Sequence, residues 1–503
     1  MKRRAFVRST LTAAAAVAIP ADELFGSLYR PLGAQVPPDI EAVTGDGREV
    51  TLSGEAVADL AARLRGRVLL GGQQGYDDAR RVLNPSFDRY PALIAQPTGA
   101  ADVGIAVDFA RENGGLLLAV KCGGHSASGK STCDRGMMID LSTFRSARAD
   151  PAALTARVTG GSLLGLVDHE TMAHGLVTPM GTVSHTGIGG LVTGGGFGRL
   201  ARRFGLSVDN LISVDVVGAD GQLRRASDTE NPDLFWGVRG GGGNFGVVTS
   251  FEFRLHPMQR EVVGGLIMFP FALARDVLTL YGDYGPDAPD ELQLDPAVVL
   301  PPGGADGMAG FSVCYSGRAA DAERALAPVR RLGTPVMDQI QSVEYVALQR
   351  SGDIGDPRAI ASYLYSGFIS ELPPALVDAI LAGLEPHPAR TTSVFFQQGG
   401  GAIGRVPGDA TAFPQRDSIA NMMAAVEWRQ GDASDEHVAW IRQYWRELEP
   451  FTQGFYVNDQ DVDATAADVR DAFRQNHERL VEVKNRYDPE NLFRLNANVQ
   501  PTV

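Results

Sequence analysis

Three glycine-rich stretches dominate this sequence: KCGGHS at residues 121–126, GIGGLVTGGGFG at 187–198 and RGGGGNFG at 239–246. Glycine accounts for 59 of the 503 residues, or about 12%, against a usual ~7%. Because glycine has no Cβ and accepts positive φ, its backbone can approach a ligand closely, and successive N–H groups can surround an anion. The three stretches together predict a long phosphate-bearing cofactor threaded between strands. Three tight turns without a ligand are the alternative.

Two of these stretches overlap familiar phosphate-binding patterns. Residues 124–131, GHSASGKS, match the P-loop pattern, but residues 132–140 after them have no helical period. Residues 241–246 match GxGxxG, but the strand-like segment 247–253 follows. Both motifs need a helix that directs its N-terminus at the phosphate. Neither nucleoside-triphosphate hydrolysis nor a nicotinamide-binding Rossmann domain is therefore predicted.

Composition and charge narrow the class of protein further. The chain carries 46 basic and 60 acidic side chains, a formal net charge of −14, with 44% hydrophobic residues. This composition is typical of a soluble globular protein with more than one domain, and the acidic balance disfavours nucleic acid or an anionic membrane as partner. Three cysteines (Cys122, Cys133 and Cys314) cannot form a disulfide framework, and no spacing suggests zinc, so no metal site is predicted.

The N-terminus resembles an export signal. Residues 2–8, KRRAFVR, precede an apolar run at about 11–19 that is too short to span a membrane. This pattern is typical of a bacterial twin-arginine signal, which exports a folded protein to the periplasm or beyond. Residues 1–35 are interpreted as signal and linker, residues 20–50 read as linker, and no stable membrane insertion is expected. A merely basic N-terminus is the alternative.

Periodicity predicts a mixture of helices and strands. Helices are expected after Ser53 and over 101–113, strands at 116–120, 137–141 and 247–255, and a hairpin at 212–226. The residue pattern changes near residue 260: helical periodicity becomes more frequent and glycine clusters become fewer. Residues 467–486 are predicted to form one last long helix.

At these residues the chain resembles the berberine-bridge-enzyme-like flavoprotein oxidases of the vanillyl-alcohol-oxidase, or PCMH-type, superfamily. The glycine stretches occur in the family's order with DLFW at 233–236, FPQR at 413–416, YVN at 456–458 and YDPENLFR at 487–494. The resemblance implies an α+β fold. It would comprise a PCMH-type FAD-binding domain of two α/β subdomains (50–260), a substrate domain with an antiparallel sheet covered by helices (261–450), and a C-terminal segment returning to the FAD domain (451–503).

The resemblance also implies FAD attached covalently to His125. Many relatives add a second bond from a cysteine, but Val183 stands at that position, so a single link is expected; Cys122 is not at the family's thiol position. His185 could line the flavin pocket or cap a turn. The residues expected to contact FAD are Lys121, Cys122, Gly123, Gly124, His125, Ser126, Gly181, Thr182, Val183, Thr186, Gly187, Gly190, Gly195, Gly246, Val247, Tyr456 and Asn458.

The resemblance further implies that Tyr456 is the catalytic base, as in relatives that act on sugars and other alcohols, and that Asn458 faces the flavin. A phenol is a poor base at neutral pH unless neighbours lower its pKa, so a partner is required. Plant relatives carry a carboxylate base on the strand that corresponds to residues 418–425, which has none here, and Gln415 replaces the family's usual histidine. A tyrosine that merely packs in the core is the alternative.

The expected reaction is oxidation of an alcohol, such as a sugar, lactol or secondary-metabolite hydroxyl, by hydride transfer to the flavin. Thr186 aligns with the residue that controls oxygen access in the family. Its volume is close to that of the valine found in oxidases, which favours O2 as acceptor and H2O2 as product. Three alternatives stay open: a dehydrogenase with another acceptor, an amine-oxidising relative, and a non-catalytic flavin-binding protein.

Overall fold

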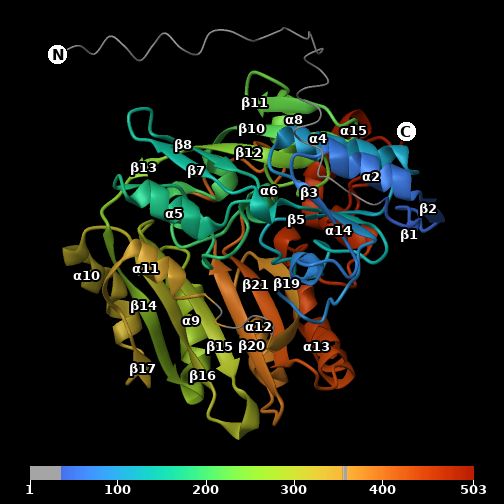
Figure 1. Cartoon of the computed structure of the whole chain (residues 1–503). Helices are drawn as coiled ribbons and strands as arrows, with labels where there is room; N and C mark the ends of the chain where they lie inside the picture. Colours follow the sequence, from blue (N-terminus) through green and yellow to red (C-terminus); the bar gives the residue numbers. More distant parts are fainter. Residues whose placement is uncertain (1–35, 354, 356–358) are drawn as a thin grey trace, which may run out of the picture.

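The computed structural model describes residues 36–353, 355 and 359–503. The predicted export signal at residues 1–35 lies outside the described residues. Figure 1 shows one part of the molecule built from several small sheets and a second part built on one large sheet with long strands. This mixture of helices with parallel and antiparallel sheets is the α+β fold expected from the sequence.

The first sheet carries the strand that leads into the KCGGHS stretch. Its order is β3 (Arg67–Leu70), β4 (Leu93–Gln96), β6 (Met137–Asp140) and β5 (Leu118–Lys121). β4, β6 and β5 are parallel, and β4 and β6 are buried at every position. Short strands buried along their whole length are expected when helices cover the sheet. The helices beside it are α2 (Gly54–Arg63), capped by the Ser53 side chain, α3 (Tyr76–Arg80) and α4 (Ala100–Glu112).

The interpretation of residues 20–50 as linker is wrong for its last part. β1 (Ile40–Val43) and β2 (Glu49–Leu52) form an antiparallel hairpin, and Ala42 and Leu52 enter the same core as α2 and α4. The strands are only four residues long, so their alternation is too short to stand out from the surrounding turn residues.

The second sheet has the order β11 (Leu223–Ser227), β10 (Leu211–Val217), β12 (Val247–Arg254), β8 (Thr155–Thr159) and β7 (Ala147–Asp150). It includes the predicted hairpin and the predicted strand after residue 246. β12 begins directly after the third glycine stretch, which explains why that stretch lacks the helix of a dinucleotide fingerprint. α5 (Leu164–Met172), α6 (Ile188–Gly194), α7 (Ala201–Phe204) and α8 (Pro232–Val238) connect and flank these strands, and β9 (Leu176–Val177) pairs with β13 (His256–Pro257).

The large sheet is antiparallel, and we call it the roof sheet. Its order is β17 (Met337–Asp338), β14 (Glu261–Pro270), β16 (Met308–Tyr315), β15 (Leu292–Leu300), β20 (Arg390–Gln398), β21 (Ala420–Arg429) and β19 (Ile360–Ile369), with β18 (Gln341–Glu344) beside β14. One face packs in a shared core with α9 (Ala274–Tyr284), α10 (Ala319–Arg330), α12 (Pro374–Gly383) and α13 (Asp435–Leu448). On β21 that face carries Met422, Ala424 and Val426, which leaves Asn421 and Met423 on the opposite face.

The last predicted helix is broken in two. α14 (Ala466–Phe473) ends at Arg474, whose φ of 45° is incompatible with a continuing helix, and α15 (His477–Tyr487) starts after a short 3₁₀ turn. The periodicity runs through both helices and therefore hid the break. α15 packs on α8 in the first part of the molecule (Figure 1). Its Lys484, fully buried, contacts Asp488 and the carbonyls of Asn244 and Phe493, which fixes the C-terminal segment to the third glycine stretch.

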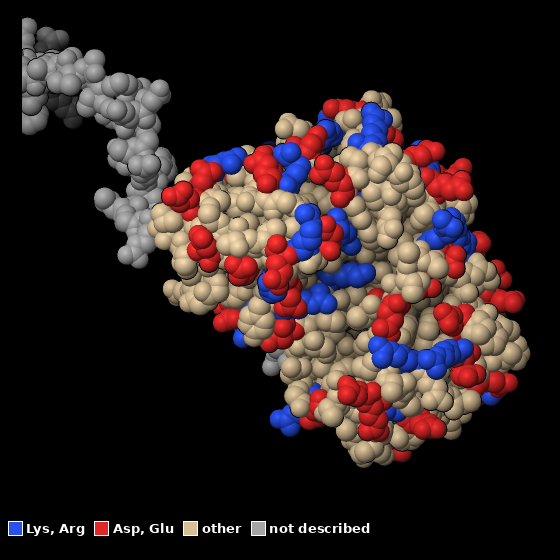
Figure 2. Space-filling model, turned by 90° about the vertical axis from the view of Figure 1, so that its right-hand side faces the viewer, with Lys and Arg blue, Asp and Glu red and all other residues tan. Residues whose placement is uncertain are grey.

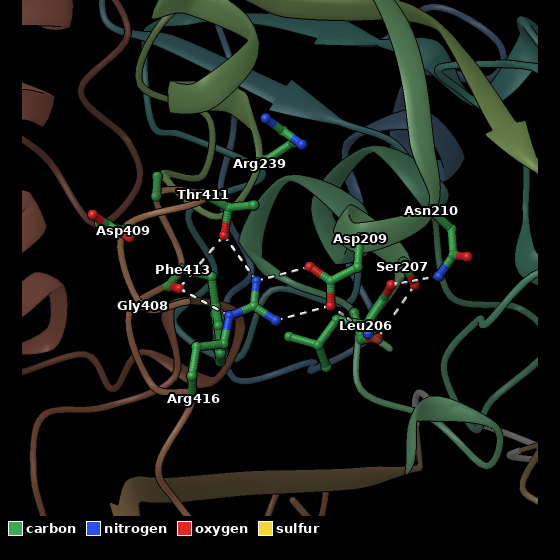
Figure 3. A network of polar contacts seen from close by, with 12 residues as sticks. Leu206, Ser207, Asp209, Asn210, Arg239, Gly408, Asp409, Thr411, Phe413 and Arg416 are labelled. Atoms are coloured by element: carbon green, nitrogen blue, oxygen red, sulfur yellow. Dashed lines mark hydrogen bonds and ion pairs between the residues drawn. The ribbon is translucent and has the colours of Figure 1, made fainter. Parts of the chain in front are cut away.

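A buried ion pair connects the loop before β21 to the segment after α7 (Figure 3). The Arg416 guanidinium donates to both carboxylate oxygens of Asp209 at 2.8 Å and to Thr411 Oγ1 at 2.8 Å. Asp209 in turn accepts from the Leu206 amide at 2.8 Å. Paired and nearly out of water, these charges hold the loop in one geometry.

The surface carries mixed charge. Figure 2 shows acidic and basic side chains interspersed over the face it presents, without a broad field of one sign. In the described ranges no helix has the length and apolar character needed to cross a membrane.

Candidate functional site

A cavity of about 390 Å³ lies where the three glycine stretches meet the segments 456–460 and 493–497. Fifteen of the residues predicted to contact the cofactor line it: Cys122, Gly123, Gly124, His125, Ser126, Gly181, Thr182, Val183, Thr186, Gly187, Gly190, Gly246, Val247, Tyr456 and Asn458. They come from points more than 300 residues apart in sequence. The structure therefore brings nearly the whole predicted set to one place.

Lys121 and Gly195 are the two exceptions, because neither lines the cavity. Lys121 belongs to β5, where side chains alternate between the two faces. Leu118, Val120 and Cys122 reach the cavity, whereas Lys121 pairs with Asp140 at 3.5 Å and donates to the Ala79 carbonyl. Gly195, with φ of 142°, lies behind the wall, where an added Cβ would come within 3.3 Å of the rings of Phe413 and Tyr456.

The first two glycine stretches touch each other through their backbones. A Cβ on Gly123 would lie 2.3 Å from the Gly187 nitrogen, and a Cβ on Gly187 would lie 2.2 Å from the Gly123 nitrogen. No side chain fits at either position. The glycines are thus required by contact between the two loops, and the cavity wall here is bare backbone.

Elsewhere the wall has room and unused hydrogen-bonding groups. A Cβ on Gly190 would meet nothing within 4 Å. The buried Ser131 Oγ and Asn496 Oδ1 line the cavity and have no hydrogen-bond partner. Unsatisfied buried polar atoms are rare in folded proteins, so a polar molecule is the natural partner for these two. A long ligand with phosphate and hydroxyl groups, as FAD has, fits this donor and acceptor set.

His125 projects into the cavity and is paired with His185. His125 Nε2 lies 2.7 Å from His185 Nδ1, and His125 Nδ1 lies 3.4 Å from Thr186 Oγ1. Burial, followed by the influence of His185, lowers the pKa of His125 to about 4. The imidazole is therefore neutral, and nucleophilic, at neutral pH. His185 itself does not line the cavity, so its interpretation as part of the pocket wall is wrong; its ring contacts His125.

The thiol and the valine beside His125 differ in what they can do. Burial raises the pKa of the Cys122 thiol to about 11, which leaves it protonated and unreactive at neutral pH. Val183 lines the cavity at the position expected for a second covalent bond and has no nucleophile. Ser184, next to it, is held by Asp353 through its amide at 2.8 Å and its hydroxyl at 2.6 Å.

Tyr456 is the N-cap of the short 3₁₀ helix η6 (Val457–Asp459). Its hydroxyl accepts hydrogen bonds from the Gly196 amide at 2.8 Å and from Asn458 Nδ2 at 2.7 Å. The rings of Phe197, Phe368 and Phe413 surround it edge to face. Burial raises the pKa of Tyr456 and outweighs these two donors, so the neighbours do not give the lowered pKa that the sequence argument required.

Several cavity residues were not predicted. Lys130 and Ser131 belong to the rejected P-loop match, and Lys130 Nζ donates to Gln460 Oε1 at 2.8 Å and to the Asn496 carbonyl at 2.9 Å. Asp459 and Gln397 also line the wall. The glycine-rich context of Lys130 was a usable signal, and so was the position of Asp459 directly after Asn458. Nothing local marks Gln397, which comes from the roof sheet.

Gln415, which replaces the family's histidine, takes no part in the wall. Its Nε2 donates to the Gln453 carbonyl at 3.2 Å and the Ala472 carbonyl at 3.5 Å. It has a packing role between the loop before β21 and the C-terminal segment.

Comparison with known proteins matches two family models. Residues 91–227 match the FAD binding domain, and residues 455–500 match the berberine and berberine-like segment. An FAD-linked oxidoreductase of Dictyostelium discoideum is 32% identical over 452 residues, 89% of this chain and 97% of that protein.

Two further relatives have named substrates. The (R)-6-hydroxynicotine oxidase of Paenarthrobacter nicotinovorans is 31% identical over 87% of this chain and 97% of its own length. The solved structure of xylooligosaccharide oxidase from Myceliophthora thermophila C1 superimposes with a TM-score of 0.78 at 25% identity, covering 89% of this chain and all of that one. The cavity, its glycine wall and these matches agree: the chain is an enzyme of the berberine-bridge-enzyme-like family of FAD-linked oxidoreductases.

Proposed function

We propose that this enzyme oxidises the hydroxyl of a small molecule, such as a sugar, lactol or secondary metabolite, with O2 as acceptor and H2O2 as product. The observation that carries the proposal is the Tyr456 hydroxyl, held at the cavity wall by Gly196 and Asn458. A phenol oriented by two donors, rather than packed at random, is suited to bind a reacting oxygen. Bound FAD would supply the acceptor for the hydride of the substrate.

The chain's own residues would divide the remaining work. The backbone amides of the glycine stretches would hold the phosphates, and Ser131 and Asn496 offer further polar contacts. Tyr456 would orient the substrate oxygen. Thr186, on the cavity wall, supports O2 as acceptor because a small side chain there leaves room for a diatomic molecule. The xylooligosaccharide oxidase relative acts on a carbohydrate, which supports an alcohol as substrate.

Amine oxidation is a second candidate. The 6-hydroxynicotine oxidase relative, at 31% identity, favours it. An amine can lose hydride without first losing a hydroxyl proton, so Tyr456 would then matter much less.

The test is a screen of the purified flavoprotein against sugars, other alcohols and amines, with flavin bleaching recorded without oxygen. An alcohol should bleach the flavin, and Tyr456→Phe, which removes the hydroxyl that orients the substrate oxygen, should slow that step while reoxidation by O2 stays near normal. Bleaching by amines alone, or an unchanged rate in Tyr456→Phe, contradicts the proposal. A flavin that alcohols reduce but O2 does not reoxidise indicates a dehydrogenase.

A single covalent bond between His125 and the flavin is part of the proposal. The neutral imidazole of His125 and the absence of a reactive thiol at Val183 and Cys122 support it. Acid-precipitated protein should stay yellow and yield one flavinyl-histidine peptide, and His125→Ala should release all its flavin. A cysteinyl adduct, or flavin that washes out of the wild type, contradicts a single histidyl link.

Export through a twin-arginine signal is proposed from residues 2–19 alone. Replacing Arg3 and Arg4 by lysine should retain the protein in the cytoplasm of the producing cell. Unchanged distribution between cytoplasm and periplasm contradicts the signal.

A further inference from the structure

The Tyr456 hydroxyl has no free lone pair with which to take a proton. A protonated phenol oxygen offers two acceptor sites, and the Gly196 amide and Asn458 Nδ2 occupy both. Burial raises the pKa of Tyr456 well above its usual value, so this hydroxyl keeps its proton at neutral pH. Tyr456 can therefore donate a hydrogen bond to a substrate oxygen, but another group must receive the proton that the alcohol loses.

Asp459 lies in the position for this role. It lines the same cavity three residues after Tyr456, and its carboxylate is near enough to raise the pKa of Tyr456. Asn421 Nδ2, from β21 of the roof sheet, donates to Asp459 Oδ2 at 2.9 Å. Asn421 also contacts Gln397 Oε1 at 3.1 Å, so two roof strands fix the orientation of the carboxylate.

The hydrogen bonding leaves part of this carboxylate available to a substrate. Among the contacts of the described residues, only Oδ2 accepts a side-chain hydrogen bond, and it accepts one. A carboxylate has about four acceptor sites. Asp459 can therefore accept a substrate hydroxyl without first breaking its bond to Asn421.

We propose that Asp459 is the catalytic base, and that Tyr456 donates a hydrogen bond that orients the same substrate oxygen. This inference rests on the alcohol oxidation proposed above. The alcohol oxygen gives its proton to the Asp459 carboxylate while the neighbouring carbon loses a hydride to the flavin, and the electron pair of the O–H bond completes the C=O bond. O2 takes up the two electrons and two protons and leaves as H2O2, which returns Asp459 to its ionised form.

The titratable side chains around the cavity differ in the role that each can take. The described residues that line it include five such groups: Cys122, His125, Lys130, Tyr456 and Asp459. β19, β20 and β21 present the uncharged Ser366, Gln397 and Asn421 toward this segment. Asp461, on the segment of Asp459 but outside the wall, is the nearest other carboxylate in sequence.

Burial sets these groups apart in pKa. It raises the pKa of Asp459 to about 6, lowers that of Lys130 to about 8 and that of His125 to about 4, and raises that of Cys122 to about 11. A base is most effective when its pKa lies near the working pH. Asp459 alone among these five groups meets that condition as an acceptor below pH 7.

The experiment measures anaerobic flavin reduction by an alcohol across pH in five proteins, the wild type and four variants. The wild-type rate should fall on the acid side with an apparent pKa of about 6. Asp459→Asn should reduce the rate about 10²–10⁴-fold and abolish its fall at acid pH. Asp459→Glu should recover part of the rate and part of this pH dependence. Tyr456→Phe should reduce the flavin more slowly, but its rate should still fall at acid pH as in the wild type. Asp461→Asn, the control, should behave like the wild type.

A spectroscopic readout separates a base from a merely structural residue. The difference between the infrared spectra of the wild type and Asp459→Asn should contain a band of a protonated carboxylic acid that disappears as pH rises through about 6. The buried Asp168, which also keeps a proton in this range, is present in both proteins and cancels in the difference. The inference is overturned if Asp459→Asn reduces the flavin at a normal rate, or if the fall of the rate at acid pH disappears in Tyr456→Phe instead. These outcomes differ from failure of the proposed function, in which no alcohol reduces the flavin of the wild type at all.

Discussion

The two walls of the cavity are built in opposite ways. On one side the Gly123 and Gly187 loops touch backbone to backbone, and few side chains intervene. On the other side Tyr456 and Asp459 of the C-terminal segment and Gln397 of the roof sheet line the cavity with their side chains, and Asn421 supports Asp459 and Gln397 from the neighbouring roof strand. A backbone wall suits an invariant part of a ligand, such as phosphates, whereas a side-chain wall can change with the substrate. We therefore expect the cofactor to bind along the backbone wall and the chemistry to depend on the side-chain wall.

The strongest test of the backbone wall is Gly187→Ala. The new Cβ would meet the Gly123 nitrogen at 2.2 Å and Cys122 Sγ at 2.5 Å, and neither can move away without displacing β5. We expect loss of bound flavin and of most folded protein, measured by flavin absorbance and thermal unfolding. Gly71→Ala is the control, because a Cβ there meets nothing within 4 Å. A Gly187→Ala enzyme with full flavin content would show that this contact does not define the wall.

The side-chain wall depends on the loop before β21, which Arg416 anchors to Asp209. Arg416→Met leaves Asp209 as a nearly buried carboxylate without its ion pair, which typically costs about 3–5 kcal/mol. Urea unfolding should show this loss. Arg275→Met, which breaks the exposed pair with Asp378, should cost at most about 1 kcal/mol. Equal losses in the two variants would mean that burial of the Arg416 pair is unimportant.

Gln349 of α11 (Tyr345–Arg350) connects the Gly181 loop of the cavity wall to α5. Its Nε2 donates to the Gly181 carbonyl at 2.8 Å and to the buried Asp168 of α5 at 3.2 Å. Burial raises the pKa of Asp168 from 3.8 to about 7. Between these values the folded chain keeps a proton that the unfolded chain releases, so the free energy of unfolding should fall as pH rises from about 4 to about 7.

Asp168→Asn removes this titration and should flatten that dependence. The variant should be more stable than the wild type at pH above 7, by about 1–4 kcal/mol, and closer to it in acid. Thermal or urea unfolding across pH measures the difference. Parallel stability curves for the two proteins would contradict a raised pKa at Asp168.

The smallest effect is expected at the exposed contact between Ser184 and Asp353. Asp353→Ala removes two hydrogen bonds to the loop beside His125, but water can replace both, so the cost should stay below about 1 kcal/mol. Urea unfolding should barely change, and flavin content should be that of the wild type. A large loss of flavin would show that the segment between α11 and β19, and not only the glycine stretches, holds the cofactor wall.

Much of the fold followed from local pattern. The strand around residues 137–140, the hairpin at 211–227 and the context that excluded both phosphate motifs were predicted correctly, because each depends on a short run of residues. The β1–β2 hairpin and the break at Arg474 were missed. In the first the strands are too short for a period, and in the second the period continues across a single residue with positive φ.

The sequence by itself determined the family, the FAD cofactor and most of the glycine wall. Glycine is needed where two backbones touch, and each such glycine can be read directly in the sequence. Only the tertiary structure decided that Lys121 faces away from the cavity, that His185 pairs with His125, and that Asn421 of the roof reaches Asp459. These are contacts between side chains far apart in the chain, or on opposite faces of one strand. Their chemistry depends on burial and on partners, which no local pattern contains.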